Sequence, residues 1–207
     1  MLRQPAKGYR ITSDSVLLAA LVPLRLHMRV LELGLGYGQV ALCMIAREPS
    51  IHVTGLELMP QAAELARQNA RLNKLAACLD VVEGNVATYI PEPVFDVVVS
   101  NPPYRLAQSH TASADPVKAA ATTEQLPLSH WADTIEALAK AGLPEITVLP
   151  LPSMPGGEVL RVVVRARRRA AGLLRLPDYV LHEANGAWRP EVDSVLRAPN
   201  ELPLWPK

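Results

Sequence analysis

The stretch "MRVLELGLGYGQVALCMIAREP", residues 28–49, decides the fold. Its first half is a short apolar run that ends in glycine, which is typical of a buried strand. From Tyr37 onward the apolar residues recur at helical spacing, and Pro49 ends the helix because proline has no N–H to donate. A strand followed directly by a helix is the first part of a β-α-β unit. The stretch therefore predicts a parallel sheet.

The same alternation of strands and helices continues on both sides of this stretch. Further predicted strands occupy residues 51–57, 79–85 and 94–100, and predicted helices occupy residues 12–23 and 60–75. Strands and helices that alternate at this spacing predict an α/β fold with a doubly wound parallel sheet. Ligands of such sheets bind at the carboxyl ends of the strands, so we expect the functional residues there.

Length and composition predict one cytoplasmic domain that spans residues 1–207. The chain of 207 residues suits a single α/β domain. No apolar stretch approaches the ~20 residues that a membrane span needs, and residues 1–10 lack the apolar core of a signal peptide. Cys43 and Cys78 lie in apolar segments without a Cys-x-x-Cys pair or clustered histidines. They are predicted to be reduced thiols, and no metal site is expected.

Acidic residues and glycines gather where the first two predicted strands end. Glu32 closes the first strand and is followed by Gly34, Gly36 and Gly38, and Glu57 closes the second strand. Glycines let the backbone turn tightly and approach a ligand at a helix N-terminus. An acid at the place of Glu57 can accept both hydroxyls of a ribose. The alternative is a tight turn with Glu57 as a helix cap, but together the features favour an adenosine-type ligand.

The spacing of the glycines separates two adenosine ligands. A dinucleotide fingerprint is G-x-G-x-x-G, whereas these glycines are evenly spaced, and Glu32 would repel a pyrophosphate but suit a cation. The arrangement resembles the first motif of class I S-adenosylmethionine-dependent methyltransferases. The resemblance implies that Glu32 lies by the methionine end of the cofactor, Glu57 holds the ribose and Asn85 lies by the adenine amino group. The family usually has Asp at the place of Asn85.

The motif "NPPY", residues 101–104, follows the fourth predicted strand. It resembles the [D/N/S]-P-P-[Y/F/W] motif of methyltransferases that modify amino nitrogens of adenine, cytosine or glutamine. The resemblance implies that the Asn101 side-chain oxygen and the Pro102 carbonyl each accept an N–H of the substrate, which aims the nitrogen lone pair at the methyl group. Tyr104 would stack on the flat substrate. The alternative is a proline-rich strand end with a core tyrosine.

Two further segments resemble the bacterial tRNA1(Val) adenine-N6 methyltransferases. In "GYRITSDSVLLAALV", residues 8–22, the matching residues are Arg10, Thr12 or Ser13, Asp14, Leu17 and Leu18. In that family this helix closes over the cofactor. The segment "YVLHEANGAWRPEVDSVLR", residues 179–197, resembles the family's ending, a His-Glu-x-x-Gly turn before a short helix. The resemblance implies methyl transfer to an adenine amino group in a tRNA anticodon loop.

The chain departs from the class I pattern after the fourth strand. About one strand and one helix are expected to be absent there, which would weaken the floor under Asn101. We therefore expect a Rossmann-like sheet that is one strand short. Its predicted segments are a cofactor-covering helix at 1–25, a cofactor half at 26–104, a mobile loop at 105–127 and a substrate-side half at 128–207.

A basic stretch, "RVVVRARRRAAGLLR", occupies residues 161–175. Alternation along a strand puts Arg165, Arg167 and Arg169 on one face, where they would hold RNA phosphates. A solvated strand end followed by a turn is the equally weighted alternative.

Three functions follow from these features. The leading one is an S-adenosylmethionine-dependent RNA adenine-N6 methyltransferase that acts on tRNA, with no membrane partner. A protein glutamine N5-methyltransferase would use the same chemistry at Asn101. An RNA-binding protein that kept the fold and lost turnover through the shortened sheet is the third.

Overall fold

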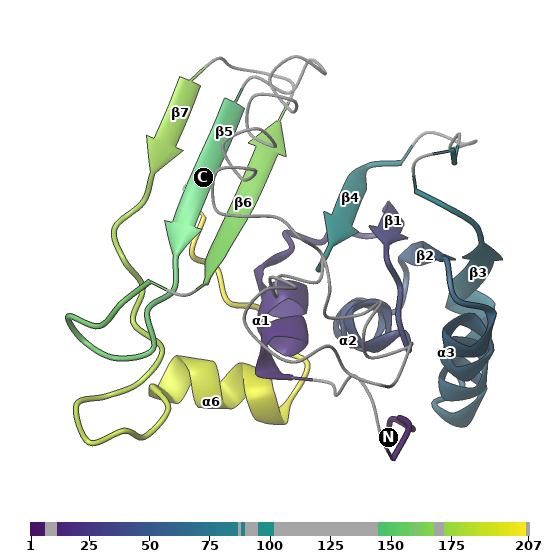
Figure 1. The fold of residues 1–207 in the computed structure, drawn as a ribbon, viewed down its shortest axis with the longest axis horizontal. Helices are drawn as coiled ribbons and strands as arrows, with labels where there is room; N and C mark the ends of the chain where they lie inside the picture. The colour runs from purple at the N-terminus through teal and green to yellow at the C-terminus, as the bar shows by residue number, and fades with distance from the viewer. Residues whose placement is uncertain are drawn as a thin grey trace, which may run out of the picture. The chain divides into compact units, whose positions relative to one another are not determined.

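The structure, a computed structural model, describes residues 1–6, 12–86, 88–89, 95–101, 145–159, 161–167 and 172–205. Its helices are α1 (Ser13–Leu21), α2 (Gln39–Arg47), α3 (Pro60–Leu72) and α6 (Pro190–Arg197), with a short 3-10 turn η1 (Ala76–Cys78) (Figure 1). Its strands are β1 (Arg29–Leu33), β2 (His52–Glu57), β3 (Leu79–Glu83), β4 (Val97–Ser100), β5 (Glu145–Pro150), β6 (Val162–Arg167) and β7 (Gly172–Arg175). By their contacts the residues fall into two compact units, Met1–Pro103 with Ser194–Lys207, and Tyr104–Asp193.

Four parallel strands form the sheet of the first unit, in the order β3-β2-β1-β4. The chain steps in one direction from β1 through β2 to β3, so right-handed crossovers put α2 and α3 on the same face of the sheet. Figure 1 shows α1, α2 and α3 in a row along this sheet. The predicted α/β fold with a parallel sheet is confirmed. The strand order reverses between β1 and β4, which makes their carboxyl ends the switch point where ligands bind in such sheets.

The core of the first unit is made where α1 and α2 pack on the sheet. Val30, Val40, Ile45 and Val53 are completely buried. Burying one such side chain stabilises the fold by about 1.5–3 kcal/mol, so this apolar contact is what holds the helices in place. The strands that carry the predicted functional residues therefore stand on a rigid base.

The carboxyl end of α1 is fixed by donors from other elements. The Arg47 guanidinium, on α2, donates to the carbonyl of Ala20 at 2.6 Å and also to the carbonyl of Val22. The Trp205 indole donates to the carbonyl of Leu21 at 2.7 Å. The last carbonyls of a helix have no partner within the helix, so these bonds satisfy them and anchor α1.

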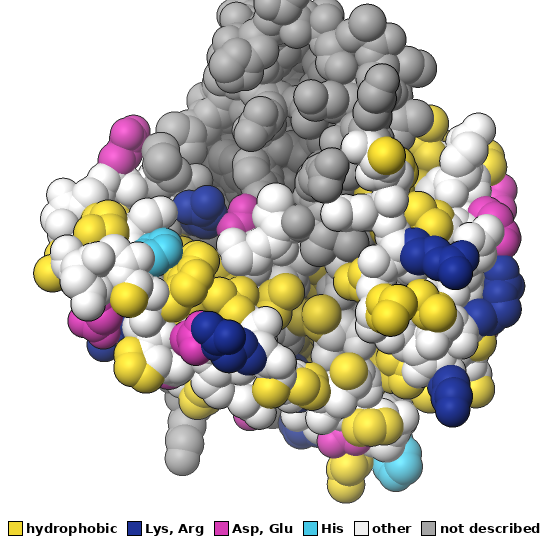
Figure 2. All heavy atoms as spheres, turned by 90° about the horizontal axis from the view of Figure 1, so that it is seen from below, with side chains coloured by type: hydrophobic (Ala, Val, Ile, Leu, Met, Phe, Trp, Pro, Cys, Tyr) yellow, Lys and Arg dark blue, Asp and Glu magenta, His cyan; other side chains and the backbone are white. Residues whose placement is uncertain are grey.

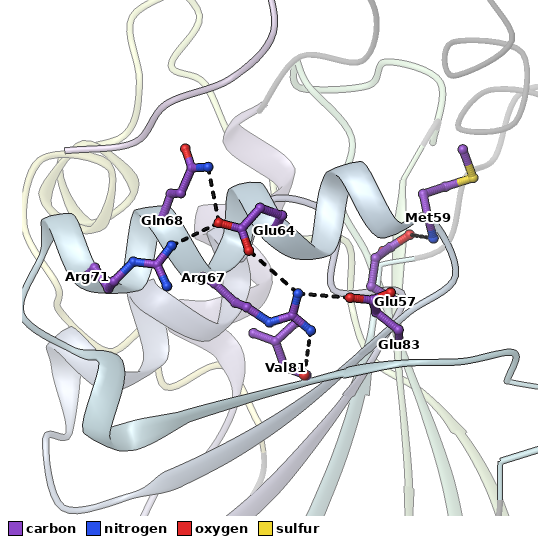
Figure 3. Close-up of polar contacts among 8 residues, drawn as sticks. All are labelled: Glu57, Met59, Glu64, Arg67, Gln68, Arg71, Val81 and Glu83. Atoms are coloured by element: carbon purple, nitrogen blue, oxygen red, sulfur yellow. Dashed lines mark hydrogen bonds and ion pairs between the residues drawn. The ribbon is translucent and has the colours of Figure 1, made fainter.

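A cluster of charged side chains fixes α3 on β3. The Arg67 guanidinium donates to Glu83 Oε1 at 2.9 Å and to the Val81 carbonyl at 3.1 Å, and Glu64 lies beside it on the helix (Figure 3). These side chains are partly exposed, so each ion pair adds little by itself. The carbonyl contact and the two carboxylates together set how α3 lies against the sheet.

The second unit contains a separate three-stranded sheet with the order β6-β5-β7. β5 is antiparallel to β6 and parallel to β7. The buried apolar residues among the described residues of this unit include Ile146, Leu149, Leu151, Leu181 and Val192. The ring of His182 stacks on Trp188 with 3.9 Å between ring centroids, which gives this histidine a packing role in the turn before α6.

Some predictions about the fold lie outside the described residues. The expected loss of one strand and one helix, and the predicted loop at 105–127, both fall within residues 102–144. The prediction of one domain over the whole chain stays a prediction. Within the described part of the chain, no helix is both long enough and apolar enough to span a membrane.

Candidate functional site

The loop between β1 and α2 lies at the switch point of the first sheet. Gly34, Gly36 and Gly38 have φ angles of 76°, 57° and 83°, in the left-handed region that glycine adopts without strain. The N–H groups of Gly34 and Leu35 both donate to the carbonyl of Leu56, on β2, at 2.9 Å. Gly34 is exposed, and a Cβ built on it would meet no described atom within 4 Å. Gly38, in contrast, is buried. The three glycines therefore allow the turn of the loop, whose backbone is accessible at Gly34.

Glu32 is a buried acid beside this loop. Its side chain is 1% exposed, and its Oε2 has no hydrogen-bond partner among the residues that the structure describes. Burial raises the pKa of the Glu32 carboxyl from its ordinary 4.5 to about 8; the backbone N–H of Ala41 opposes the rise and the charge of Glu57 adds to it. A buried carboxyl oxygen without a partner is costly, and a cationic ligand at the loop would relieve that cost.

Glu57 lies at the end of β2 and uses both carboxyl oxygens. Oε2 accepts the N–H of Gly36 at 2.7 Å, and Oε1 accepts the N–H of Met59, the N-cap of α3, at 2.9 Å (Figure 3). The bond to Met59 holds the residue just before α3 and does not cap the N–H groups of the helix's first turn. Each carboxyl oxygen accepts more than one hydrogen bond, so these two bonds are compatible with the predicted ribose contact. Glu57 also joins the end of β2 to the glycine loop.

Asn101 directly follows β4, one strand away from the glycine loop. Leu33 and Ser100 are register partners, and the Ser100 hydroxyl donates to the carbonyl of Leu33 at 2.9 Å. Asn101 and Gly34 are therefore the first residues after the ends of two paired strands, β4 and β1. Its side-chain Nδ2 lies 3.3 Å from Oγ of Ser15, on α1. The structure thus brings Asn101 together with the helix that was predicted to cover the cofactor.

The remaining predicted residues of the first unit lie at the edges of this region. Thr12 is the N-cap of α1, and Asp14 lies in the first turn of that helix. Asn85 comes two residues after β3, where its carbonyl accepts the N–H of Thr88 and of Tyr89. The roles of these three residues toward a cofactor stay predictions.

The predicted RNA-binding residues belong to the second unit. Arg165 and Arg167 lie on β6, as register partners of Thr147 and Glu145 on β5. Arg167 Nε is 3.7 Å from Glu145 Oε1. Burial lowers the pKa of the Arg165 guanidinium, and the neighbouring charge of Arg167 lowers it further. Four other predicted site residues, Arg10, Pro102, Tyr104 and Arg169, lie outside the described residues.

Comparison with known families identifies the chain. Residues 9–123, more than half of the chain, match the methyltransferase small domain family. The chain belongs to this family. Its fold also matches the crystal structure of a predicted O-methyltransferase from Agrobacterium tumefaciens, with a TM-score of 0.71 and 24% identity over 91% of this chain and 98% of that one. The family match includes the glycine loop, Glu57 and Asn101.

Curated relatives of this methyltransferase small domain carry two different names. A tRNA1(Val) (adenine(37)-N6)-methyltransferase of Pedobacter heparinus is 37% identical over 49% of this chain and 43% of the relative. Its counterpart in Aeromonas hydrophila is 35% identical over 54% and 47%. A release factor glutamine methyltransferase of Deinococcus radiodurans is 39% identical over 53% and 42%. The chain thus aligns with less than half the length of each of these relatives.

The structure adds three polar residues that the sequence analysis did not select. Ser15 is fully buried against Asn101. Gln39 is buried below the glycine loop and accepts the N–H of Tyr37 at 3.2 Å. Asn69, on α3, is fully buried and donates to the carbonyl of Tyr37 at 3.0 Å. Their common signal in the sequence is an uncharged polar residue on the buried face of a helix.

A cleft of the methyltransferase small domain lies away from these residues. Hydrophobic side chains gather across the middle of the face that Figure 2 shows. In the first unit a cleft of about 260 Å³ is lined by Ala19, Leu42, Val195 and other residues of α1, α2, α6 and the chain after α6. Of the predicted site residues that the structure describes, none lines it. Arg47 and Arg197 are the charged side chains that line it, and Arg47 holds the end of α1.

Proposed function

We propose that the protein transfers a methyl group from S-adenosylmethionine to the exocyclic amino nitrogen of an adenine in RNA, with tRNA as the substrate. The observation that carries the proposal is the juxtaposition at one sheet edge of three features. These are a glycine loop that is exposed at Gly34, the Glu32 carboxyl oxygen that has no hydrogen-bond partner among the described residues, and Asn101 at the end of the adjacent strand.

The residues at the end of β1 and β2 fit this cofactor. The buried Oε2 of Glu32 suits the cationic methionine end, because a positive charge there compensates the buried carboxylate. Glu57 offers lone pairs to a ribose, and its bond to the Gly36 N–H fixes the loop against it. S-adenosylmethionine, when bound, supplies a methyl group activated by its sulfonium. The protein's task is then to hold and orient an amino nitrogen.

Asn101 is the residue proposed to act on that nitrogen. An exocyclic amino lone pair is delocalised into its ring, so the nitrogen is a poor nucleophile. A side-chain oxygen that accepts one of its N–H bonds draws the nitrogen toward tetrahedral geometry and directs its lone pair. The two fixed ends of β4 support this role, since Ser100 bonds to Leu33 and the Asp96 carboxylate accepts the Arg29 N–H at 2.8 Å. Pro102 and Tyr104 are proposed to add a carbonyl acceptor and a stacking ring.

Adenine in tRNA is preferred because the tRNA1(Val) enzymes share the family's core with this chain and because the chain carries arginines on β6. A nucleobase in a structured loop is splayed out to reach such a site. The relative from Deinococcus radiodurans favours the second candidate, glutamine of a release factor. Both substrates present a planar amide or amidine-like nitrogen, so Asn101 would act on either in the same way.

Transfer of tritiated methyl groups separates the candidate functions. The full chain is incubated with labelled S-adenosylmethionine and, in parallel, total tRNA, tRNA-free ribosomal RNA and a release factor. The proposal predicts label in tRNA that is recovered as N6-methyladenosine. Label in the release factor alone refutes it in favour of glutamine, and no label with retained RNA binding favours an RNA-binding protein without turnover. Calorimetric titration with S-adenosylhomocysteine and with NAD tests the cofactor, and tighter binding of NAD would contradict the assignment.

A further inference from the structure

We propose that Ser15 is a positioning residue for Asn101, with its hydroxyl holding the plane of the Asn101 carboxamide. The inference rests on the proposed function, in which Asn101 orients the substrate nitrogen. It gives α1 a second role beside the cofactor, because the same helix would set the geometry of the group that faces the substrate.

The contact joins two elements that are far apart in the sequence. Asn101 Nδ2 donates to Ser15 Oγ over 3.3 Å, across 86 residues of chain. Ser15 is 0% exposed, so its hydroxyl exchanges no hydrogen bond with bulk water. A buried hydroxyl destabilises the fold unless it is hydrogen-bonded, and Asn101 supplies a hydrogen bond to Ser15.

Both partners of the contact are held in place by other bonds. β4 is fixed to β1 at its carboxyl end by the Ser100 side chain. α1 is fixed by Leu17, which is 2% exposed in the core, and by Arg47 and Trp205 at its carboxyl end. A hydrogen bond between two rigid elements loses little entropy on forming, so it can define one orientation of a short side chain.

The chemistry of a carboxamide makes this orientation matter. The Asn101 amide is planar, and it carries an acceptor, Oδ1, and a donor, Nδ2, at two different ends of that plane. With Nδ2 directed to Ser15, Oδ1 is left to accept an N–H from the substrate. If the plane turns over, Nδ2 faces the substrate amino group, and two donors then meet. A serine hydroxyl can bond either end of a carboxamide, so Ser15 holds the amide plane in place, and the N–H of the substrate, which needs Oδ1 as its acceptor, favours the orientation that the structure records.

Nuclear magnetic resonance of the side-chain amides tests the contact without any methyl transfer. In the ¹⁵N-labelled full chain, the Asn101 NH₂ pair is assigned by its loss in Asn101→Ala. We expect Ser15→Ala to shift this pair and leave the pair of Asn69, on α3, unchanged. Serine to alanine raises helix propensity, so the variant keeps α1. An Asn101 pair that does not move in Ser15→Ala overturns the proposal.

Kinetics then test whether the contact positions Asn101 for the reaction. Ser15→Ala should lower kcat by about 2- to 10-fold, the effect of one neutral hydrogen bond, with the KM for S-adenosylmethionine unchanged. In the Asn101→Ala background the same substitution should cause no further loss, because Ser15 acts only through Asn101. Equal losses in both backgrounds overturn the positioning role.

Ser50→Ala is the matched control. It removes a hydroxyl of the same unit that donates to Glu48 at 2.7 Å, beyond the end of α2 and away from the glycine loop. The control should keep the parent's kcat, and a loss like that of Ser15→Ala would also overturn the proposal. A parent protein that transfers methyl to no substrate refutes the proposed function instead, while the amide resonances still decide the contact between Ser15 and Asn101.

Discussion

The buried carboxyl of Glu32 should make the stability of the ligand-free protein depend on pH. Burial raises its pKa from 4.5 to about 8. In the unfolded chain the group ionises near its ordinary pKa, so between those two values the folded state binds more protons than the unfolded state. The free energy of unfolding therefore falls as pH rises through this window. Glu32→Gln keeps the shape of the side chain and cannot ionise, so it should remove this dependence.

The size of the effect follows from the width of the window. Each pH unit between the two pKa values costs about 1.36 kcal/mol, so raising the pH from 4.5 to 7 should destabilise the parent by about 3 kcal/mol relative to Glu32→Gln. At pH 4.5 the two proteins should differ little, because both then carry a neutral group. Above pH 8 the penalty should level off.

Urea denaturation at a series of pH values between 4.5 and 8, without ligand, measures this difference. Glu64→Gln is the control, because Glu64 is an exposed carboxyl on α3 whose pKa is lowered by Gln68 and then by Arg71. It should follow the parent's slope over this range. A parent whose free energy of unfolding runs parallel to that of Glu32→Gln over the whole range would refute the reasoning.

Three further predictions follow. Gly55→Ala should lower the free energy of unfolding, measured by urea denaturation, by about 1–3 kcal/mol, because the added methyl would lie 2.5 Å from Leu35 Cδ1 in the packed loop. An unchanged denaturation midpoint would show that the loop moves aside without cost. Glu57→Ala should weaken the binding of S-adenosylhomocysteine, measured by calorimetry, by about 1.5–3 kcal/mol, since it removes a charged acceptor. Unaltered affinity would exclude the ribose contact. Replacing Arg165 and Arg167 by Gln should lower the slope of log RNA affinity against log salt by about 1.4, at about 0.7 per phosphate contact. An identical slope would leave both arginines as parts of a solvated strand.

The first half of the fold was predictable because its signals are local. The apolar run before Gly34 and the helical spacing up to Pro49 predicted β1 and α2 to within two residues at each end. Pro60 at a first helical position likewise set the start of α3. Each signal depends on backbone sterics or on apolar periodicity within a few residues. Such effects act without knowledge of the tertiary fold.

The missed features depend on contacts between distant residues. β7 is formed by four exposed residues that pair with β5, and a short strand without a buried face has no periodicity to recognise. Ser15 reads as one more polar residue in a helix until the fold places Asn101 beside it. Asn69 is a similar case, because its partner Tyr37 is 32 residues away.

The candidate site likewise contains features that local sequence predicts and features that depend on contacts between distant residues. The positions of Glu32 and Glu57 at strand ends followed from the strand predictions, and the structure brings Glu57 to the glycine loop as expected. The unpartnered oxygen of Glu32 and its raised pKa could not be predicted, because they arise from the nearly complete burial of that carboxyl in the folded protein. Burial of this kind is a property of the packed molecule.

Asn101→Ala gives the most direct test of the account. The measurement is the kcat of methyl transfer to tRNA beside the calorimetric affinity for S-adenosylhomocysteine, in the parent and in the variant. We predict that kcat falls by at least about 10-fold, since Asn101 acts on the substrate nitrogen, while the affinity for the cofactor product stays within about twofold. An equal loss of cofactor affinity, or a variant that transfers methyl as fast as the parent, would contradict the claim that the ends of β1 and β4 form a methyl-transfer site.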